Sequence, residues 1–332
     1  MLNWAFSPTR GIRTIRGWRE RIVVICLVIP LAVASCAAVP ESKNTSFSEA
    51  ASPEKSLAPM AYYHFLEGYL SELDEDFTRA LEQYRAGLQF DSDSAFLRVR
   101  MASLYFSSGN IQKTVNLLEQ IEPASVRNPR VLTQMAKMFA GAGKSDQALL
   151  LFNQAITTNP ERSESYLEKG VFLFNRKQLD ESEQMFARSV ELQPQGPMGY
   201  FYLGKVNQAK SKSDEAQSNY RKTINRAPQF ARGHQELYKL LEAAGQASAA
   251  VEVLEGYLTA VNPRHQKFRQ ELVRLLLRQK KFSRALTELE FMIDQDPDDL
   301  NAKIRRALVF AEIKDTPRAI DCLLYTSDAA DE

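Results

Sequence analysis

The sequence of 332 residues predicts an all-α fold, a superhelical solenoid of antiparallel helix pairs. The first observation is a row of small residues with steps of 34, 34, 34, 34, 34, 35 and 34 residues. The row consists of Ala80, Thr114, Ala148, Ser182, Ala216, Ala250, Ala285 and Ala319. The other two observations are further residues at fixed offsets from this row and helix breakers between the units. A solenoid presents an extended surface, so binding of another molecule is its expected activity.

Two further sets of residues keep fixed distances from this row. Twelve residues before each small residue lies another residue, which is itself small in six of the eight units. This set is Gly68, Ala102, Ala136, Gly170, Gly204, Tyr238, Val273 and Ala307. Four residues after the small residue come the bulky side chains Tyr84, Leu118, Phe152, Phe186, Tyr220, Leu254 and Leu289. Small residues let two helices cross closely and the bulky one fills the gap, so each unit is predicted to be a packed helix pair.

Helix breakers separate the predicted helices. Twelve residues after the small residue, several units carry a proline, which lacks an amide hydrogen and ends a helix pair. These residues are Pro160, Pro194, Pro228 and Pro297, with Pro263 one residue late. The first two units have Ser92 and Val126 there. Short breaks at residues 108–110, 141–144 and 244–246 lie within units and predict turns between antiparallel helices.

This pattern resembles the tetratricopeptide repeat (TPR) family. The resemblance is best in two units, at Tyr166, Gly170, Ser182, Phe186 and Pro194 and at Tyr200, Leu203, Gly204, Ala216, Tyr220 and Pro228. It covers the chain from residue 61 onward, and the last of its eight repeats is cut short. The repeats start near Ala61, Ala95, Pro129, Ser163, Pro197, Ala231, Gln266 and Leu300. Thr114, Tyr238 and Val273 stand at normally smaller positions, which changes local packing but not the expected fold.

Residues 1–35 have the features of a signal peptide. Five arginines, from Arg10 to Arg21, precede an apolar run of 13 residues from Ile22 to Ala34. A transmembrane helix needs about 20 apolar residues, so this run fits a signal-peptide core better than a membrane span. The arginines hold the N-terminal side of the run in the cytoplasm.

The apolar run ends in Val33-Ala-Ser-Cys36, which resembles a bacterial lipobox. The resemblance implies that Cys36 is lipidated and becomes the first residue of the mature chain. Ala37 follows it, which favours export to the outer membrane, so we expect a lipid-anchored protein of the cell envelope that faces the periplasm. Residues 36–60 are rich in Ala, Ser, Glu, Pro and Lys, which predicts a flexible tether.

Two alternatives to a lipoprotein stay open. An ordinary signal peptidase could cut near Cys36 and release a soluble chain, or the segment could stay uncleaved as an inner-membrane anchor extended through Val39. In each case the repeats lie outside the inner membrane.

The last eleven residues, Cys322–Glu332, resemble the translation of a transposase-type sequencing adapter. On this interpretation the solenoid comprises residues 61–321, the eighth repeat is cut within a helix, and the natural protein is longer. The alternative is a genuine end of the eighth repeat, since Leu323 falls on a bulky position. A solenoid without a polar cap exposes an apolar end, which favours the first interpretation.

Charge and motifs give no indication of nucleic-acid binding or catalysis. The net charge of the chain is +1, to which residues 1–35 contribute +4 and residues 322–332 contribute −3, so residues 36–321 are neutral. The three histidines are scattered, and the acidic run from Asp294 to Asp299 lacks the glycine and the final glutamate of a calcium loop. We therefore predict no catalytic residue, no metal site and no cofactor in residues 37–321.

The resemblance implies that the first helix of each repeat lines an inner groove, at positions two, five, nine and twelve. In repeats one and two these positions hold Tyr62, Phe65, Tyr69, Phe96, Val99 and Phe106. Later repeats place there Arg130, Lys137, Lys205, Arg232, Lys239, Lys267 and Arg274. We expect the aromatic end to anchor apolar side chains and the basic stretch to accept an acidic or C-terminal peptide.

These features predict a membrane-tethered scaffold that binds a protein or peptide partner. The resemblance to lipoproteins of secretion, pilus assembly and polysaccharide export suggests an envelope machine as its setting, by analogy alone. Two other functions stay open: an inner-membrane assembly factor with an uncleaved anchor, and the docking module of a longer enzyme.

Overall fold

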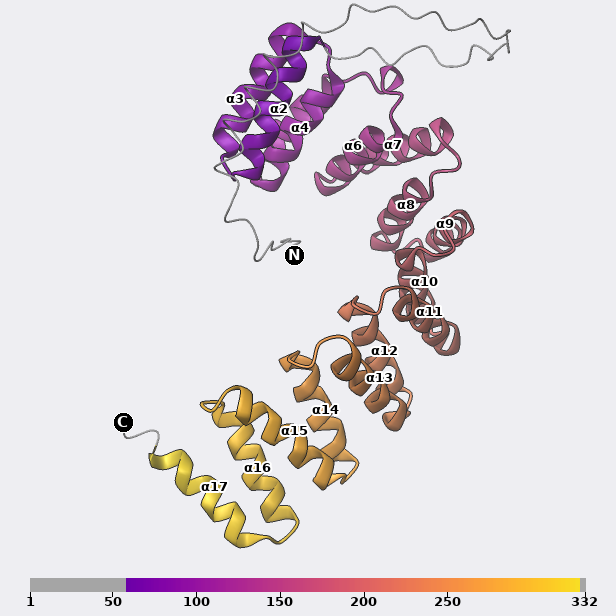
Figure 1. The fold of residues 1–332 in the computed structure, drawn as a ribbon. Coiled ribbons are helices and arrows are strands. Elements are labelled where there is room, and N and C mark those ends of the chain that lie inside the picture. Colours follow the sequence, from indigo (N-terminus) through magenta and orange to yellow (C-terminus); the bar gives the residue numbers. More distant parts are fainter. Residues whose placement is uncertain (1–57, 329–332) are drawn as a thin grey trace, which may run out of the picture. The chain divides into compact units, whose positions relative to one another are not determined.

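A computed structural model describes residues 58–328 of the chain, and Figure 1 shows the course of its helices. These residues form the α-helices α2 to α17 and one 3-10 turn, η1, and no β-strand occurs among them. The helices lie in one compact unit, residues 54–332. The predicted all-α solenoid of helix pairs is therefore confirmed. The signal peptide, Cys36 and residues 37–57 of the tether lie outside the described residues.

Each repeat consists of a first and a second helix. The first helices are α2 (Pro59–Leu73), α4 (Ala95–Ser107), α6 (Pro129–Gly141), α8 (Ser163–Asn175), α10 (Pro197–Ala209), α12 (Ala231–Ala243), α14 (Gln266–Arg278) and α16 (Leu300–Glu312). The second helices are α3 (Phe77–Phe90), α5 (Ile111–Glu119), α7 (Ser145–Thr158), α9 (Leu179–Leu192), α11 (Ser213–Arg226), α13 (Ala247–Ala260), α15 (Phe282–Gln295) and α17 (Thr316–Asp328). Apart from α2, every first helix begins at the residue where the sequence places the start of a repeat.

Repeat two differs from the others in its second helix. Helix α5 has only 9 residues, and the 3-10 turn η1 (Pro123–Ser125) follows it before α6. The sequence has Val126 instead of a boundary proline in this repeat, and that valine is buried. Gln154 of α7 donates a hydrogen bond to the carbonyl of Pro123 at 2.6 Å, which attaches the turn to the next repeat.

The two helices of a repeat cross at the small residues of the sequence pattern. All eight small residues of the row and all seven bulky residues are buried. The crossing leaves no room for a larger side chain: a Cβ atom on Gly204 would lie 2.5 Å from the ring of Tyr220. The same is true of Gly170 against Phe186, at 2.6 Å. Close packing of this kind explains why small and bulky residues recur together.

The turn between the two helices of a repeat is also repeated. One residue in each turn has a positive φ, and these residues are Glu75, Gly109, Gly143, Lys177, Ser211, Gly245, Lys280 and Lys314. The next residue donates its amide hydrogen to the carbonyl five residues earlier, as Asn110 does to Tyr105 at 2.8 Å. This geometry is the Schellman motif, which satisfies free carbonyls at a helix end. Only the turns that contain glycine are recognisable from the sequence.

Candidate partner-binding surface

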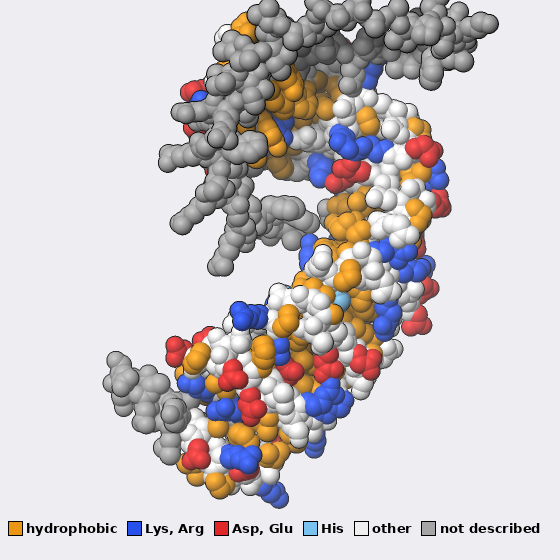
Figure 2. All heavy atoms as spheres, in the orientation of Figure 1, with side chains coloured by type: hydrophobic (Ala, Val, Ile, Leu, Met, Phe, Trp, Pro, Cys, Tyr) orange, Lys and Arg blue, Asp and Glu red, His pale blue; other side chains and the backbone are white. Residues whose placement is uncertain are grey.

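The predicted partner-binding residues lie on the first helices, and several neighbouring first helices pack against one another. Helix α4 contacts α6, α6 contacts α8, and α8 contacts α10. We call the surface formed by positions two, five, nine and twelve of the first helices the first-helix face. In Figure 2, hydrophobic side chains gather around α2 and α4, and basic and acidic side chains mix along the later helices.

Phe65 is the centre of an aromatic cluster at the beginning of the first-helix face. Its ring centroid lies 4.9 Å from that of Phe96, 6.1 Å from that of Tyr69 and 6.2 Å from that of Tyr62. Phe65 is half-buried, whereas Tyr62, Tyr69 and Phe96 are 52%, 41% and 39% exposed. Contacts between the rings hold three exposed aromatic side chains in place, which suits them to anchor apolar groups of a partner.

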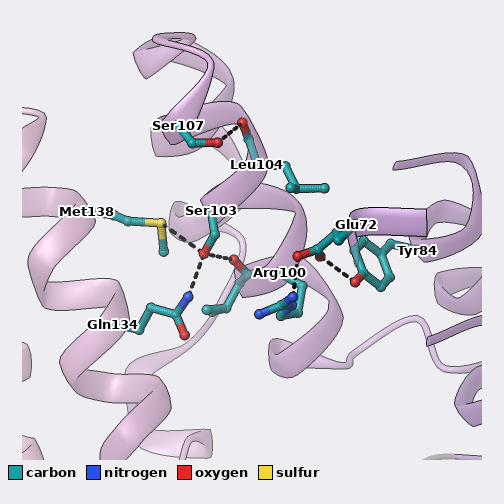
Figure 3. A network of polar contacts seen from close by, with 9 residues as sticks. Glu72, Tyr84, Arg100, Ser103, Leu104, Ser107, Gln134 and Met138 are labelled. Atoms are coloured by element: carbon teal, nitrogen blue, oxygen red, sulfur yellow. Dashed lines mark hydrogen bonds and ion pairs between the residues drawn. The ribbon is translucent and has the colours of Figure 1, made fainter. Parts of the chain in front are cut away.

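A polar network beside this cluster connects α2, α3 and α4 (Figure 3). Glu72 forms an ion pair with Arg100 and accepts a hydrogen bond from the Tyr84 hydroxyl at 2.5 Å. Burial and the hydrogen bond to Glu72 raise the pKa of Tyr84, so its hydroxyl stays a donor. Arg100 also lies over the ring of Tyr69, 5.6 Å from its centroid. The network thereby restrains one of the exposed rings of the aromatic cluster.

A pocket of about 490 Å³ opens between α4, α6 and α8. Its lining consists of Ser103, Phe106, Arg130, Thr133, Gln134, Lys137, Met138, Glu164 and Glu168. The ring of Phe106 lies against Gly141 of α6, where an added Cβ atom would come within 2.3 Å of it. The pocket therefore brings together three of the residues that the sequence predicts, Phe106, Arg130 and Lys137.

Hydrogen bonds order the wall of this pocket between α4 and α6, as Figure 3 shows. Gln134 donates to the Ser103 hydroxyl at 2.6 Å, and that hydroxyl donates to the carbonyl of Val99 at 2.8 Å. The Met138 sulfur lies 3.7 Å from the same hydroxyl. On the other side, Lys137 Nζ lies 2.7 Å from Glu168 Oε1 of α8.

Arg130 makes one end of the pocket positive. Its side chain is exposed and forms no ion pair with any acidic residue between 58 and 328. Arg162 lies close to it and pairs with Glu164. Burial and the positive charge of Arg130 lower the pKa of Arg162. An unpaired guanidinium beside Phe106 can accept a carboxylate while the ring contacts apolar groups.

The other predicted cations differ in their surroundings. Lys205 Nζ lies 3.6 Å from Glu236, and Arg274 is 2.7 Å from Glu242 and 2.8 Å from Glu271. The hydrogen bond from Arg274 lowers the pKa of Glu242. The remaining three are exposed: Arg232, which lies over the Phe201 ring at 5.7 Å, Lys239 and Lys267.

The first-helix face thus carries mixed charge where the sequence suggests a basic stretch. Acidic side chains of neighbouring first helices, Glu168, Glu236 and Glu242, pair with three of the seven predicted cations. One further residue of the prediction, Val99, is corrected: it is only 1% exposed and belongs to the core. The contribution of the other residues to partner binding stays a prediction.

Metal sites and membrane spans do not occur in the part of the chain that the structure describes. No group of His, Cys, Asp or Glu between residues 58 and 328 is placed to hold a metal ion. Within the same range, no helix has the length and apolar character needed to cross a bilayer.

Comparison with known families and structures gives two kinds of match. A family model of the FAT domain matches residues 89–277, and a tetratricopeptide repeat model matches residues 271–331. No curated protein matches the sequence.

Several solved structures are similar in fold. PilW, described as a widely conserved type IV pilus biogenesis factor, is 19% identical with a TM-score of 0.56 over 65% of this chain and 99% of its own. The C-terminal part of a TPR protein from Cytophaga hutchinsonii is 14% identical, with a TM-score of 0.56 over 73% and 97%. A tetratricopeptide repeat protein from Parabacteroides merdae is 15% identical, with a TM-score of 0.52 over 76% and 100%.

Proposed function

Because the chain belongs to the tetratricopeptide repeat family and, over residues 89–277, to the FAT domain family, we propose that it is a scaffold that holds a protein or peptide partner on its first-helix face. The observation that carries this proposal is the pocket between α4, α6 and α8, and the aromatic cluster around Phe65 on α2 and α4 supports it. The ligand is a peptide with an apolar side chain on Phe106 and an acidic group or C-terminal carboxylate on Arg130.

We further propose that the scaffold is anchored by a lipid on Cys36 to the outer membrane and faces the periplasm. The lipobox resemblance supports this localisation, and the composition of residues 37–57, which predicts a flexible tether, fits a solenoid that begins with α2 at Pro59. Assembly of an envelope machine for secretion, pilus formation or polysaccharide export is the proposed setting. The fold shared with a pilus biogenesis factor is compatible with that setting.

Charge reversal on the first-helix face tests partner binding. We expect the triple variant Lys137→Glu, Lys205→Glu and Lys239→Glu to lose the proteins that the full chain captures from solubilised envelopes of its own cell. The reason is that the new carboxylates at positions 137 and 205 would lie beside Glu168 and Glu236, whose cations have been removed. The resulting negative charge on the first-helix face would repel an acidic ligand. The measurement is affinity capture with the tagged full chain followed by protein identification.

A matched triple variant controls for net charge. Lys144, Lys177 and Lys280 are exposed in the turns between helices, away from the first-helix face. Their reversal to Glu changes the charge equally and should leave capture intact. Equal capture by both triple variants would show that the partner does not bind the first-helix face.

Labelling of Cys36 tests the membrane anchor. Cells that express the full chain should incorporate radioactive palmitate into it, and the Cys36→Ala variant should incorporate none. Globomycin, which blocks the lipoprotein signal peptidase, should cause a larger, unprocessed form to accumulate. A chain that fractionates with the inner membrane, without label and without a response to globomycin, would instead indicate the uncleaved anchor.

A further inference from the structure

At four junctions between repeats, the residue at position nine of one first helix contacts the residue at position six of the next first helix. These contacts are the cation–π contact of Tyr69 with Arg100, the hydrogen bond of Ser103 with Gln134, and the ion pairs of Lys137 with Glu168 and of Lys205 with Glu236. In every pair the two side chains are 31 residues apart and attract each other. The repeat therefore supplies position six with a partner from within the chain.

The junction between repeats seven and eight has a cation at both positions. Position nine is Arg274 and position six is Arg305, again 31 residues apart. Arg274 donates two hydrogen bonds to Glu242, each of 2.7 Å, and a third from Nε to Glu271 at 2.8 Å. Arg305 is exposed and forms no ion pair with any acidic side chain between residues 58 and 322. This junction thus has an arginine where two others have a glutamate, and that arginine is free to bind an anion.

Arg305 lines a pocket of about 290 Å³ that lies between the end of α14, the start of α15 and α16. Most of the lining is apolar. Val309 belongs to a buried core cluster, and Leu277 and Phe282 pack against the same cluster, so the core holds this part of the pocket in place. Leu308 also lines the pocket and is 63% exposed. An apolar group that enters the pocket would cover it, which favours binding.

The other charges around the pocket balance one another. Arg278, which lines the pocket, lies 2.5 Å from Glu242. With Arg274 and Glu271, these residues form a neutral group of two arginines and two glutamates.

The two remaining charged residues of the lining besides Arg305 are Lys280 and Glu312, and their charges are opposite. The pocket is therefore left with an excess of one positive charge, at Arg305, beside an apolar surface.

We propose that this pocket binds a peptide segment that carries a carboxylate close to a large apolar side chain. The carboxylate accepts hydrogen bonds from the Arg305 guanidinium, and the apolar side chain covers Leu308. A carboxylate is the expected anion because Glu168 and Glu236 complete two other junctions in the same register. The site is separate from the pocket between α4, α6 and α8, so the proposal does not depend on ligand binding there.

The spacing of the two groups defines the segment. Arg305 and Leu308 are three residues apart on α16, so their Cβ atoms are about 5–6 Å apart. In an extended peptide, side chains two residues apart lie on the same side and are about 7 Å apart. A glutamate followed two residues later by leucine therefore fits the pocket. A C-terminal leucine, whose own carboxylate lies beside its side chain, is the second source of the same chemistry.

Photo-cross-linking of the full chain in detergent tests the site. The probe is a short peptide with both ends blocked that contains Glu-Gly-photo-leucine, in which a diazirine replaces part of the leucine side chain. After irradiation, mass spectrometry should find the probe attached to residues 277–282 or 305–312. A probe with glutamine in place of glutamate should label these residues at least ten-fold less. A peptide that ends in photo-leucine with a free carboxylate, compared with its amide, shows whether the C-terminus is the better source.

Three variants identify the groups that hold the probe. Arg305→Glu should reduce labelling of the pocket at least ten-fold, because two carboxylates would repel each other. Leu308→Ser should reduce labelling without a change of charge. Lys314→Glu is the control: it changes the charge by the same amount in the exposed turn after α16, outside the pocket lining. Glutamate suits this turn, since Glu75 has the same positive φ in repeat one. Circular dichroism confirms that each variant is folded.

Three results would overturn the proposal. The first is equal labelling of the pocket in Arg305→Glu and Lys314→Glu. The second is cross-linking of the probe to α4, α6 or α8 alone, which would support the first pocket and exclude this one. The third is labelling that vesicles of phosphatidylglycerol abolish and the unlabelled glutamate peptide does not, which would assign the pocket to a lipid.

Discussion

Replacement of Gly204 by alanine should destabilise the solenoid by about 3 kcal/mol. The added methyl group would lie 2.5 Å from Tyr220 Cε1 and 3.0 Å from Tyr220 Cζ. Tyr220 is fully buried, and its hydroxyl donates a hydrogen bond to Gln208 at 2.8 Å, so the ring cannot move aside without breaking other contacts. The measurement is urea unfolding of the variant and of the unchanged chain, with far-ultraviolet circular dichroism as the signal.

Gly256→Ala is the matched control, because Gly256 also lies within a helix, α13, but an added Cβ atom would meet nothing within 4 Å. Alanine there should stabilise the helix by about 0.5–1 kcal/mol, since glycine loses more backbone entropy on folding. Because each repeat contacts only its neighbours, the loss of stability in Gly204→Ala should be local. Repeats five and six should unfold at a lower urea concentration than the rest of the solenoid. If both variants unfold at the same urea concentration, close packing at Gly204 does not limit stability.

The helix boundaries could be predicted well because the repeat makes every local signal recur. The small residues mark each helix pair and prolines mark five of the boundaries, so a weak signal in one repeat is supported by the next. The turn at Lys177 shows where this fails. Lysine carries no turn signal, although with a φ of 62° it takes the place that glycine has in other repeats. Its left-handed conformation is imposed by the packing of the two helices on either side.

The charge of the first-helix face was harder to predict because it depends on pairs between repeats. Lys137 pairs with Glu168, and Lys205 pairs with Glu236, each 31 residues further along the chain. Both pairs join position nine of one first helix to position six of the next. The family pattern leaves position six outside the groove, so it gives no sign of the neutralising carboxylates. Repeat seven starts one residue late, so its position six is Glu271, which lies 2.8 Å from Arg274 of the same helix, and Lys239 is exposed.

The residues of the aromatic cluster could be predicted from the sequence, but the contacts between their rings could not. Spacing along α2 places Tyr62, Phe65 and Tyr69 on one side of a helix. It does not reveal that Phe65 is half-buried under Phe96, or that Arg100 lies over Tyr69. These contacts depend on how repeat two crosses repeat one, and the crossing angle follows from packing rather than from residue spacing.

The stability of the solenoid should fall steeply with pH above about 10. Burial raises the pKa of Tyr84, Tyr220 and Tyr238, in the last case to about 12. In the unfolded chain a tyrosine ionises near pH 10, so above that pH the folded chain holds more protons than the unfolded chain. Stability from these three groups is complete below pH 10 and is lost as the pH rises toward the folded values. Each contributes about 1.4 kcal/mol per pH unit, or about 4 kcal/mol per unit together.

Urea unfolding at intervals between pH 8 and 11.5 measures this slope, and absorbance at 295 nm reports tyrosine ionisation. Tyr220→Phe should reduce the slope by about 1.4 kcal/mol per pH unit, because one of the three groups no longer titrates. Tyr62→Phe should leave it unchanged, since the Tyr62 side chain is 52% exposed. If the unchanged chain and Tyr220→Phe release the same number of protons on unfolding at pH 11, Tyr220 is already ionised in the folded chain. Its phenol would then be accessible to solvent, because the core of repeat five opens locally. A matching loss in both variants would likewise exclude burial as the cause of the alkaline transition.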